Sequence, residues 1–144
     1  MPTSSAEDNI AVIRNFFAAY GGGDMTRVQA FFAEDIVWRI PGRHPLSGEK
    51  RGKAEVSAFF LELGKAGFKA EPLFFGADGD YVVDVHRGWS NVENAPNVDT
   101  MWALVFKVVD GKIAEATNLS ADQDAANAFF WSAYRLKPIP DRLA

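Results

Sequence analysis

The sequence predicts an α+β domain in which a curved antiparallel or mixed sheet folds over its helices. Apolar residues in the first part of the chain recur at helical spacing, and four later segments are rich in β-branched and aromatic residues. Asp110-Gly111 is a tight hairpin signal between the last two of these segments. Helices followed by a meander of strands are typical of the α+β class.

The first part of the chain should form helices and one strand. A helix capped within residues 3–9 is expected to end at glycines 21–23, with an inward face of Ile10, Ile13, Phe16, Phe17 and Tyr20. Asp24 can cap a second, shorter helix through Val28, Phe31 and Phe32, which leads into a strand over residues 36–40. Residues 43–52 are then expected to be an irregular loop, before a third helix over residues 53–63.

The rest of the chain is expected to be extended up to a closing helix. Strands are predicted at residues 68–75, 81–90, 99–109 and 112–119, and an amphipathic helix at 121–134. Asp122-Gln123-Asp124 should cap that helix, and Lys137-Pro138-Ile139-Pro140 in the tail cannot continue it. Without a repeat or linker, residues 1–144 are expected to form one domain with a core of about 8–134 and a tail of 135–144.

Composition narrows the class of protein. The chain has 144 residues, 48% of them hydrophobic, which suits one domain with a buried core. The net charge is −4 and the 15 Lys and Arg residues are scattered, so no nucleic-acid partner is expected. The lack of cysteine excludes disulfides and thiolate metal sites. No apolar stretch is long enough to span a bilayer and no leader pattern is visible, so we expect a cytoplasmic protein without a membrane partner.

The predicted strand over residues 81–90 carries the main candidate for chemistry. Side chains alternate across a strand, so Asp84 and His86 share one face, with Cα atoms about 6.5–7 Å apart. That spacing allows a direct or water-bridged contact. The acid would favour the imidazolium and burial would oppose it, and either way the pair could exchange protons near neutral pH. The alternative is a polar patch on a solvent-facing strand. A metal site is not expected, because no third convincing ligand is visible.

Several motifs resemble a known group of proteins. They are Phe16-Phe17-Ala18-Ala19-Tyr20 with Gly23-Asp24, Phe31-Phe32-Ala33-Glu34-Asp35-Ile36-Val37-Trp38, Pro45-Leu46-Ser47-Gly48 with Gly52, and Asp110-Gly111-Lys112-Ile113. Together with the element order, they resemble the ketosteroid isomerase and SnoaL-like polyketide cyclase group of the nuclear-transport-factor-two-like superfamily. The resemblance covers residues of about 8–124. It implies a cone-shaped α+β barrel around a deep pocket for small apolar molecules, usually in a dimer.

The sequence departs from this group at the positions that carry isomerase chemistry. The resemblance implies a base carboxylate near the end of the first strand, a tyrosine on the first helix and a protonated aspartate on a later strand. Here Arg39 or its neighbours, Phe16 and Trp102 stand at those places. None of them can supply the base or the two donors to a dienolate oxygen, so the ketosteroid isomerase mechanism is not expected.

The same register indicates which residues face the pocket. Asp84 and His86 are the catalytic candidates. The candidates for substrate binding are Phe16, Tyr20, Trp38, Arg39, Phe60, Trp102 and Asn118, with Thr100 also on the pocket side. Trp38 and Arg39 compete for the far wall, because a one-residue slip in register exchanges the faces.

Plainer roles are open for several of these residues. Arg39 could be a surface ion-pair partner, and Asn118 could bond a strand edge. His44 would be exposed or at the pocket rim. Trp38, Trp102 and Trp131 are core residues by default.

Two classes of function fit this pattern. The first is a cofactor-independent acid/base enzyme of isomerase, cyclase or hydrolase type, acting on a small apolar carbonyl compound. His86 would move the proton, Asp84 would orient it or act itself, and Asn118 or Arg39 would stabilise negative charge. An epoxide hydrolase is a variant that needs two acids and an arginine. The second class is a non-catalytic module that binds a ligand or a partner, or an association subunit with a vestigial pocket.

The outer face of the sheet is a candidate interface. Val83 and Val85 should match Met101, Ala103 and Val105 on a face that the helices cannot cover. A large exposed apolar surface usually marks association, so a homodimer through this face is expected.

Overall fold

A mixed sheet of six strands, in the order β2-β1-β6-β5-β4-β3, organises the chain. A computed structural model describes residues 5–93 and 96–134. In chain order its elements are α1 (Ala6–Gly21), α2 (Met25–Gln29), β1 (Phe32–Ile40), β2 (Gly48–Arg51), α3 (Gly52–Lys65), β3 (Phe68–Asp78), β4 (Tyr81–Ser90), β5 (Asp99–Val109), β6 (Lys112–Ser120) and α4 (Gln123–Ala133). The predicted α+β class is confirmed.

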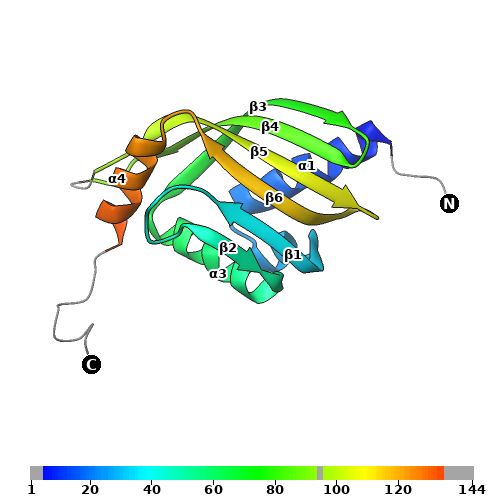
Figure 1. Cartoon of the computed structure of the whole chain (residues 1–144), viewed down its shortest axis with the longest axis horizontal. Coiled ribbons are helices and arrows are strands. Elements are labelled where there is room, and N and C mark those ends of the chain that lie inside the picture. Colours follow the sequence, from blue (N-terminus) through cyan, green and yellow to red (C-terminus); the bar gives the residue numbers. More distant parts are fainter. Residues whose placement is uncertain (1–4, 94–95, 135–144) are drawn as a thin grey trace.

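The sheet curves around α1 and α3, and α4 lies at one end of the resulting cone (Figure 1). Strand β1 pairs in parallel with β6, whereas the other neighbouring strands pair antiparallel. The edge strands β2 and β3 are not paired with each other, so the expected barrel is an open cone. None of the helices in the described part of the chain is long and apolar enough to cross a membrane.

Short polar side chains cap α1, α2 and α4 where the sequence indicated. Ser5 and Asp8 form a reciprocal capping box at the start of α1. Asp24 accepts a hydrogen bond from the Arg27 N–H at α2, and Asp122 accepts one from the Ala125 N–H at α4, both as predicted. The prediction for the C-terminal tail, residues 135–144, lies outside the described residues.

Two predictions about local structure are wrong. The second helix ends at Gln29, and Phe32 instead begins β1, where it pairs with Ile113 of β6 and is buried. The segment that was expected to be an irregular loop contains the edge strand β2. Its residues are exposed or half-buried, so the sequence has no apolar alternation there to indicate a strand.

Aromatic rings fill the space between the sheet and the helices. Phe16 on α1 lies at the centre, with ring centroids 5.4–6.5 Å from those of Phe17, Phe31, Phe32, Trp38, Phe60 and Phe106. Trp38 and Trp102 are buried as expected. Trp131 is not a core residue: it is 47% exposed, and its indole N–H donates to the Arg43 carbonyl. The closing helix therefore buries Phe129 and Phe130 and leaves its tryptophan outside.

Candidate functional site

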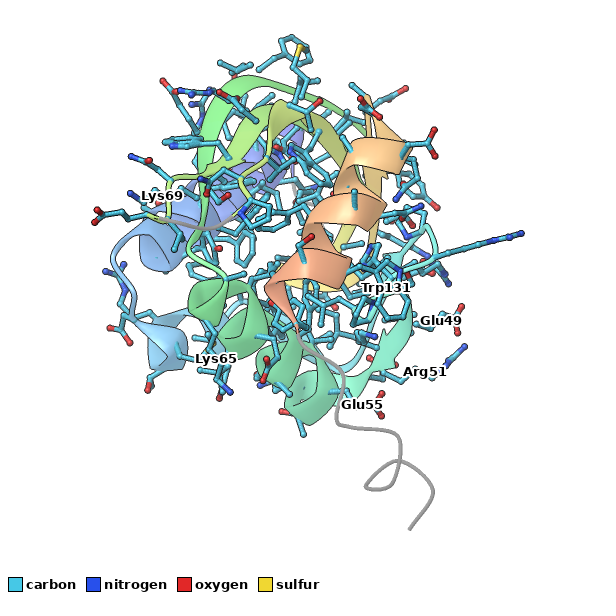
Figure 2. The ribbon with its side chains drawn as sticks, turned by 90° about the vertical axis from the view of Figure 1, so that its left-hand side faces the viewer. Glu49, Arg51, Glu55, Lys65, Lys69 and Trp131 are labelled. Atoms are coloured by element: carbon cyan, nitrogen blue, oxygen red, sulfur yellow. The ribbon has the colours of Figure 1, made fainter. Side chains whose placement is uncertain are left out.

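A narrow apolar cavity lies inside the cone. Its volume is about 50 Å³, counted as the space open to the centre of a water-sized sphere. Helices α1, α3 and α4 and all strands except β2 contribute to its wall, which consists of Phe16, Phe17, Tyr20, Trp38, Ile40, Phe59, Phe60, Leu63, Phe68, Ala70, His86, Trp102, Leu104, Asn118 and Phe130. Figure 2 views the molecule from the end at which α4 lies. A ligand in this cavity would be surrounded mainly by aromatic carbon.

Asp84 and His86 form a buried hydrogen-bonded pair on the inner face of β4. The distance from His86 Nδ1 to Asp84 Oδ2 is 2.6 Å, and the two residues are 4% and 0% exposed. His86 lines the cavity, whereas Asp84 lies behind it, between β3 and Leu104 of β5. The alternative of a solvent-facing polar patch is therefore wrong. The pair is shielded and in direct contact.

Burial controls the protonation of the carboxyl group. It raises the pKa of Asp84 above the ordinary value, while the hydrogen bond and the charge of His86 act in the opposite direction. The second carboxyl oxygen, Oδ1, is buried, and no side chain of the described residues donates a hydrogen bond to it. Oδ2 is thus the oxygen that holds the imidazole, and an ionised Asp84 accepts the Nδ1–H of His86.

This arrangement leaves the other ring nitrogen for a ligand. With the proton of a neutral imidazole on Nδ1, Nε2 carries a lone pair and can accept a proton. The Phe17 ring lies 5.6 Å from the His86 ring and limits its movement on one side. The imidazole of His86 is therefore held by a carboxylate at the wall of an apolar cavity, and its role as a base or an acid stays a prediction.

Most other polar groups of the wall are already engaged. The Tyr20 hydroxyl donates to the Phe68 carbonyl at 2.9 Å, and burial raises the pKa of Tyr20 to about 12. The Trp102 indole N–H donates to the Gly88 carbonyl at 3.1 Å. Asn118, half-buried on β6, makes no side-chain hydrogen bond to the rest of the described chain. His86 and Asn118 are thus the lining residues with polar atoms left for a ligand, within the part of the chain that the structure describes.

The structure places most predicted ligand-contacting residues at the cavity. Phe16, Tyr20, Trp38, Phe60, Trp102 and Asn118 all line it, and their roles in binding stay predictions. Trp38 is the inward residue of β1. Arg39 points to the other side, where it pairs with Glu49 at 3.2 Å and Glu115 at 3.1 Å. The prediction that Arg39 contacts substrate is therefore wrong, because β1 alternates and its odd position faces outward.

Two further positions differ from the sequence predictions. Thr100 lies in a surface hollow beside α4 and does not line the cavity. His44 is neither exposed nor at the rim: it is 7% exposed and stacks on Phe130 with ring centroids 4.5 Å apart. Its Nδ1 accepts a hydrogen bond from the Leu46 N–H. Burial, with a smaller effect of Lys50, lowers the pKa of His44 to about 4, so the ring is neutral near pH 7.

Phe68 and Phe130 are lining residues that sequence reasoning missed. Phe68 begins β3, and Phe130 lies on the inner face of α4 beside Phe129. The apolar side of an amphipathic closing helix could have indicated Phe130, but not that this side faces a cavity. The described residues contain no cluster of three or more His, Asp or Glu side chains that could hold a metal ion.

Residues 13–116 match the SnoaL-like domain family, so the chain belongs to this family. An uncharacterised protein of Mycobacterium tuberculosis is 29% identical over 130 residues, which are 86% of this chain and 96% of that protein. The match places the chain in the nuclear-transport-factor-two-like superfamily, as the motifs predicted.

Solved structures share the fold. Bal32a, from a soil-derived mobile gene cassette, has 28% identity and a TM-score of 0.81, with 87% of this chain and 98% of that chain covered. A protein of the same superfamily from Burkholderia xenovorans has 29% identity and a TM-score of 0.73, with coverage of 88% and 98%. An LEH-like epoxide hydrolase of M. tuberculosis, at 20% identity, a TM-score of 0.71 and coverage of 87% and 92%, shares the fold alone.

Proposed function

We propose that the protein is a cofactor-independent acid/base enzyme that acts on a small apolar carbonyl compound in the inner cavity. The observation that carries this proposal is the buried contact of 2.6 Å between Asp84 and His86, whose imidazole lines a mainly apolar wall. A fold shared with enzymes supports catalysis at the level of the family.

The chemistry follows from the two polar groups that face the cavity. The lone pair of His86 Nε2 takes a proton from the carbon next to the carbonyl, and the electrons of that C–H bond move onto the carbonyl oxygen. The amide N–H of Asn118 donates to the resulting enolate oxygen. The imidazolium, balanced by Asp84, then returns the proton to the same or another carbon. The sequence is redox-neutral, and it consumes no co-reactant.

The epoxide hydrolase variant has less support. It needs a second acid and an arginine next to the reacting water, and the described wall of the cavity contains neither. Arg39 is the arginine that the sequence offered for this role, but it pairs with two glutamates on the outer face.

Proton exchange into substrate tests the proposal without knowledge of the final product. Small cyclic and aryl ketones are incubated in D₂O with the protein, and the loss of α-proton signals is followed by NMR. We expect exchange that falls about 10²–10⁴-fold in His86→Gln and strongly in Asp84→Asn. His44→Gln is the control at the other buried histidine: His44 does not line the cavity, so this variant should lose far less exchange than His86→Gln. Equal exchange in wild type and His86→Gln would refute the proposal.

The alternative is a non-catalytic binding module, which the small volume of about 50 Å³ favours. Such a module would bind a compact apolar ligand and catalyse no exchange. In that case Asp84→Asn weakens binding modestly and changes no rate, whereas an enzyme loses turnover.

We also propose that two copies associate through the outer face of the sheet. Its support is the exposed apolar surface of β4, β5 and β6, where Met101 is 52%, Leu119 47% and Val83 36% exposed. Light scattering should give the mass of a dimer for the wild type and of a monomer for Met101→Asp. Leu61→Asp on α3, at a side chain 54% exposed, is the matched control and should stay dimeric. A monomeric wild type contradicts the proposal. We further propose a cytoplasmic location, which rests on the sequence patterns alone.

A further inference from the structure

A second hollow lies outside the cavity, between the α1–α2 turn, α3 and the start of β3. The space for the centre of a water-sized sphere is about 490 Å³ there, compared with about 50 Å³ in the inner cavity. The two hollows share a wall of four residues, Tyr20, Phe60, Phe68 and Ala70. We call this second hollow the outer groove.

Three glycines border the outer groove. A Cβ atom added at Gly21, Gly23 or Gly64 would meet no atom within 4 Å, so the backbone there borders open space. Gly64 is the second-last residue of α3, and its φ is not positive, so other residues could adopt its backbone conformation. A side chain longer than that of alanine at this position would extend into the open space of the groove.

The chemistry of the groove is that of an amphiphile. Met25 and Trp89 line it half-buried, and Leu61 lines it with 54% of its surface exposed. Lys69 is the charged residue of its lining, and it stands directly opposite Trp89 across β3 and β4. Figure 2 shows Lys69 at the margin of the molecule. An apolar surface with one cation at its margin suits a chain that ends in an anion.

The neighbouring charges leave Lys69 available. The guanidinium group of Arg87 lies 4.3 Å above the centre of the Trp89 ring. The same group donates two hydrogen bonds to Asp99. Glu71 is opposite Arg87 on the adjacent strand, not opposite Lys69. No carboxylate of the described residues lies within ion-pair distance of the Lys69 ammonium group.

We propose that the outer groove is a second binding site, which holds the alkyl chain of a carboxylate-terminated amphiphile with its carboxylate next to Lys69. The chain would lie along Met25, Leu61 and Trp89 and end at the wall shared with the inner cavity. This inference does not depend on catalysis by His86, and it stands if the inner cavity proves to be a binding site alone.

An NMR titration of the ¹⁵N-labelled protein with octanoate locates the ligand. We expect shifts of the Gly64 amide and the Trp89 indole N–H, which border the groove, and none of the Trp102 indole N–H, which is bound to Gly88 behind the inner cavity. Shifts confined to Trp102 would mean that octanoate enters the inner cavity, and the proposal would fall. An absence of shifts up to millimolar octanoate would also overturn it.

Variants separate the chain from the charge. Gly64→Leu should weaken octanoate binding about ten-fold, as expected if roughly two methylenes lose their contact, while Gly64→Ala leaves the groove open and is the matched control. Lys69→Gln should weaken octanoate about five-fold and leave 1-octanol unchanged. An unchanged affinity in Gly64→Leu, or equal losses for acid and alcohol in Lys69→Gln, contradicts the proposal.

A further variant distinguishes this proposal from the proposed function. Asp84→Asn, far from the groove on the inner face of β4, should leave octanoate binding as in the wild type. If Asp84→Asn abolishes octanoate binding and Gly64→Leu does not, the ligand occupies the inner cavity. The groove proposal then fails, and the acid/base proposal is unaffected.

Discussion

The two histidines of the chain are buried to nearly the same extent, yet their partners give them opposite properties. His44 is 7% exposed and His86 is 4% exposed. Nδ1 of His44 accepts from the Leu46 N–H, so the proton of its neutral ring must sit on Nε2. Nδ1 of His86 instead faces the Asp84 carboxyl group, and an ionised Asp84 accepts the Nδ1–H, which leaves the lone pair on Nε2. Burial alone therefore does not make a histidine a base.

Phe130 lies between the two environments. Its ring stacks on His44, and the same side chain lines the cavity that His86 faces. One histidine thus supports the wall of the cavity from behind, and the other belongs to the wall. His44 is thus a packing residue, whereas His86 is the candidate for the proposed chemistry.

Removal of the carboxylate should have the largest effect on stability. Asp84→Ala leaves the His86 Nδ1–H buried without an acceptor, and we expect a loss of about 2–3 kcal/mol in the free energy of unfolding. Asp84→Asn keeps an acceptor at this position and should lose less. Urea denaturation of both variants measures the difference. Equal stability of Asp84→Ala and wild type would show that the pair is not buried as the structure has it.

The pH dependence of stability should identify His44. Its pKa is lowered to about 4 in the folded state, compared with 6.5 for an ordinary histidine. The unfolded chain therefore takes up this proton first, and stability is lost as the pH falls from 6.5 towards 4. We expect about 2 kcal/mol, less than the full shift would give, because water screens part of the ring. Unfolding measured across this range should be flatter in His44→Gln, and an unchanged slope would contradict this role.

Asp84 should give the stability a pH dependence of the opposite sign. Its pKa is raised in the folded state, so the stability it contributes is present below about pH 3.8 and is lost as the pH rises through the raised value. The effect should be smaller than that of His44, because the hydrogen bond from His86 favours the charged form. With rising pH, Asp84→Asn should therefore gain stability relative to the wild type. A relative loss would mean that His86 outweighs burial.

Loss of the ring stacking between Phe130 and His44 should have the smallest effect on stability. Phe130→Leu keeps an apolar side chain but removes the stacking on His44, and we expect a loss of about 1 kcal/mol in the free energy of unfolding. Because Phe130 also lines the cavity, the same variant should alter ligand binding. Thermal unfolding and ligand titration on the same samples test both effects. If neither the unfolding temperature nor the ligand affinity changes, Phe130 supports neither the packing of His44 nor the cavity that His86 lines.

Sequence patterns predicted the inward face of β4 but left the inward face of β1 open. Alternation placed Asp84 and His86 on one side of β4, and the structure has them there in contact. It could not choose between Trp38 and Arg39, since one extra residue in β1 exchanges the faces. Edge strand β2 was missed, because its polar sequence Gly-Glu-Lys-Arg has no apolar period.

Local sequence patterns could not predict the positions of residues that contacts distant in the sequence determine. His44 lies in a segment rich in proline and glycine, which indicates a surface loop, yet Phe130 covers it from the other end of the chain. Trp131 was expected inside by its size and lies outside, because the inner face of α4 is occupied by Phe129 and Phe130. The outer groove depends on open space beside Gly64, which no sequence pattern reports.

The tautomers of the two imidazole rings test the central claim most directly. Long-range ¹H–¹⁵N NMR correlations distinguish a proton on Nδ1 from one on Nε2, and the His44→Gln variant assigns the two rings. The account predicts that neutral His86 carries its proton on Nδ1 in the wild type and that Asp84→Asn no longer fixes this single tautomer. His44 should carry its proton on Nε2 in both proteins. A His86 that carries its proton on Nε2, or that is indifferent to Asp84→Asn, would contradict the assignment of His86 as the base of the cavity.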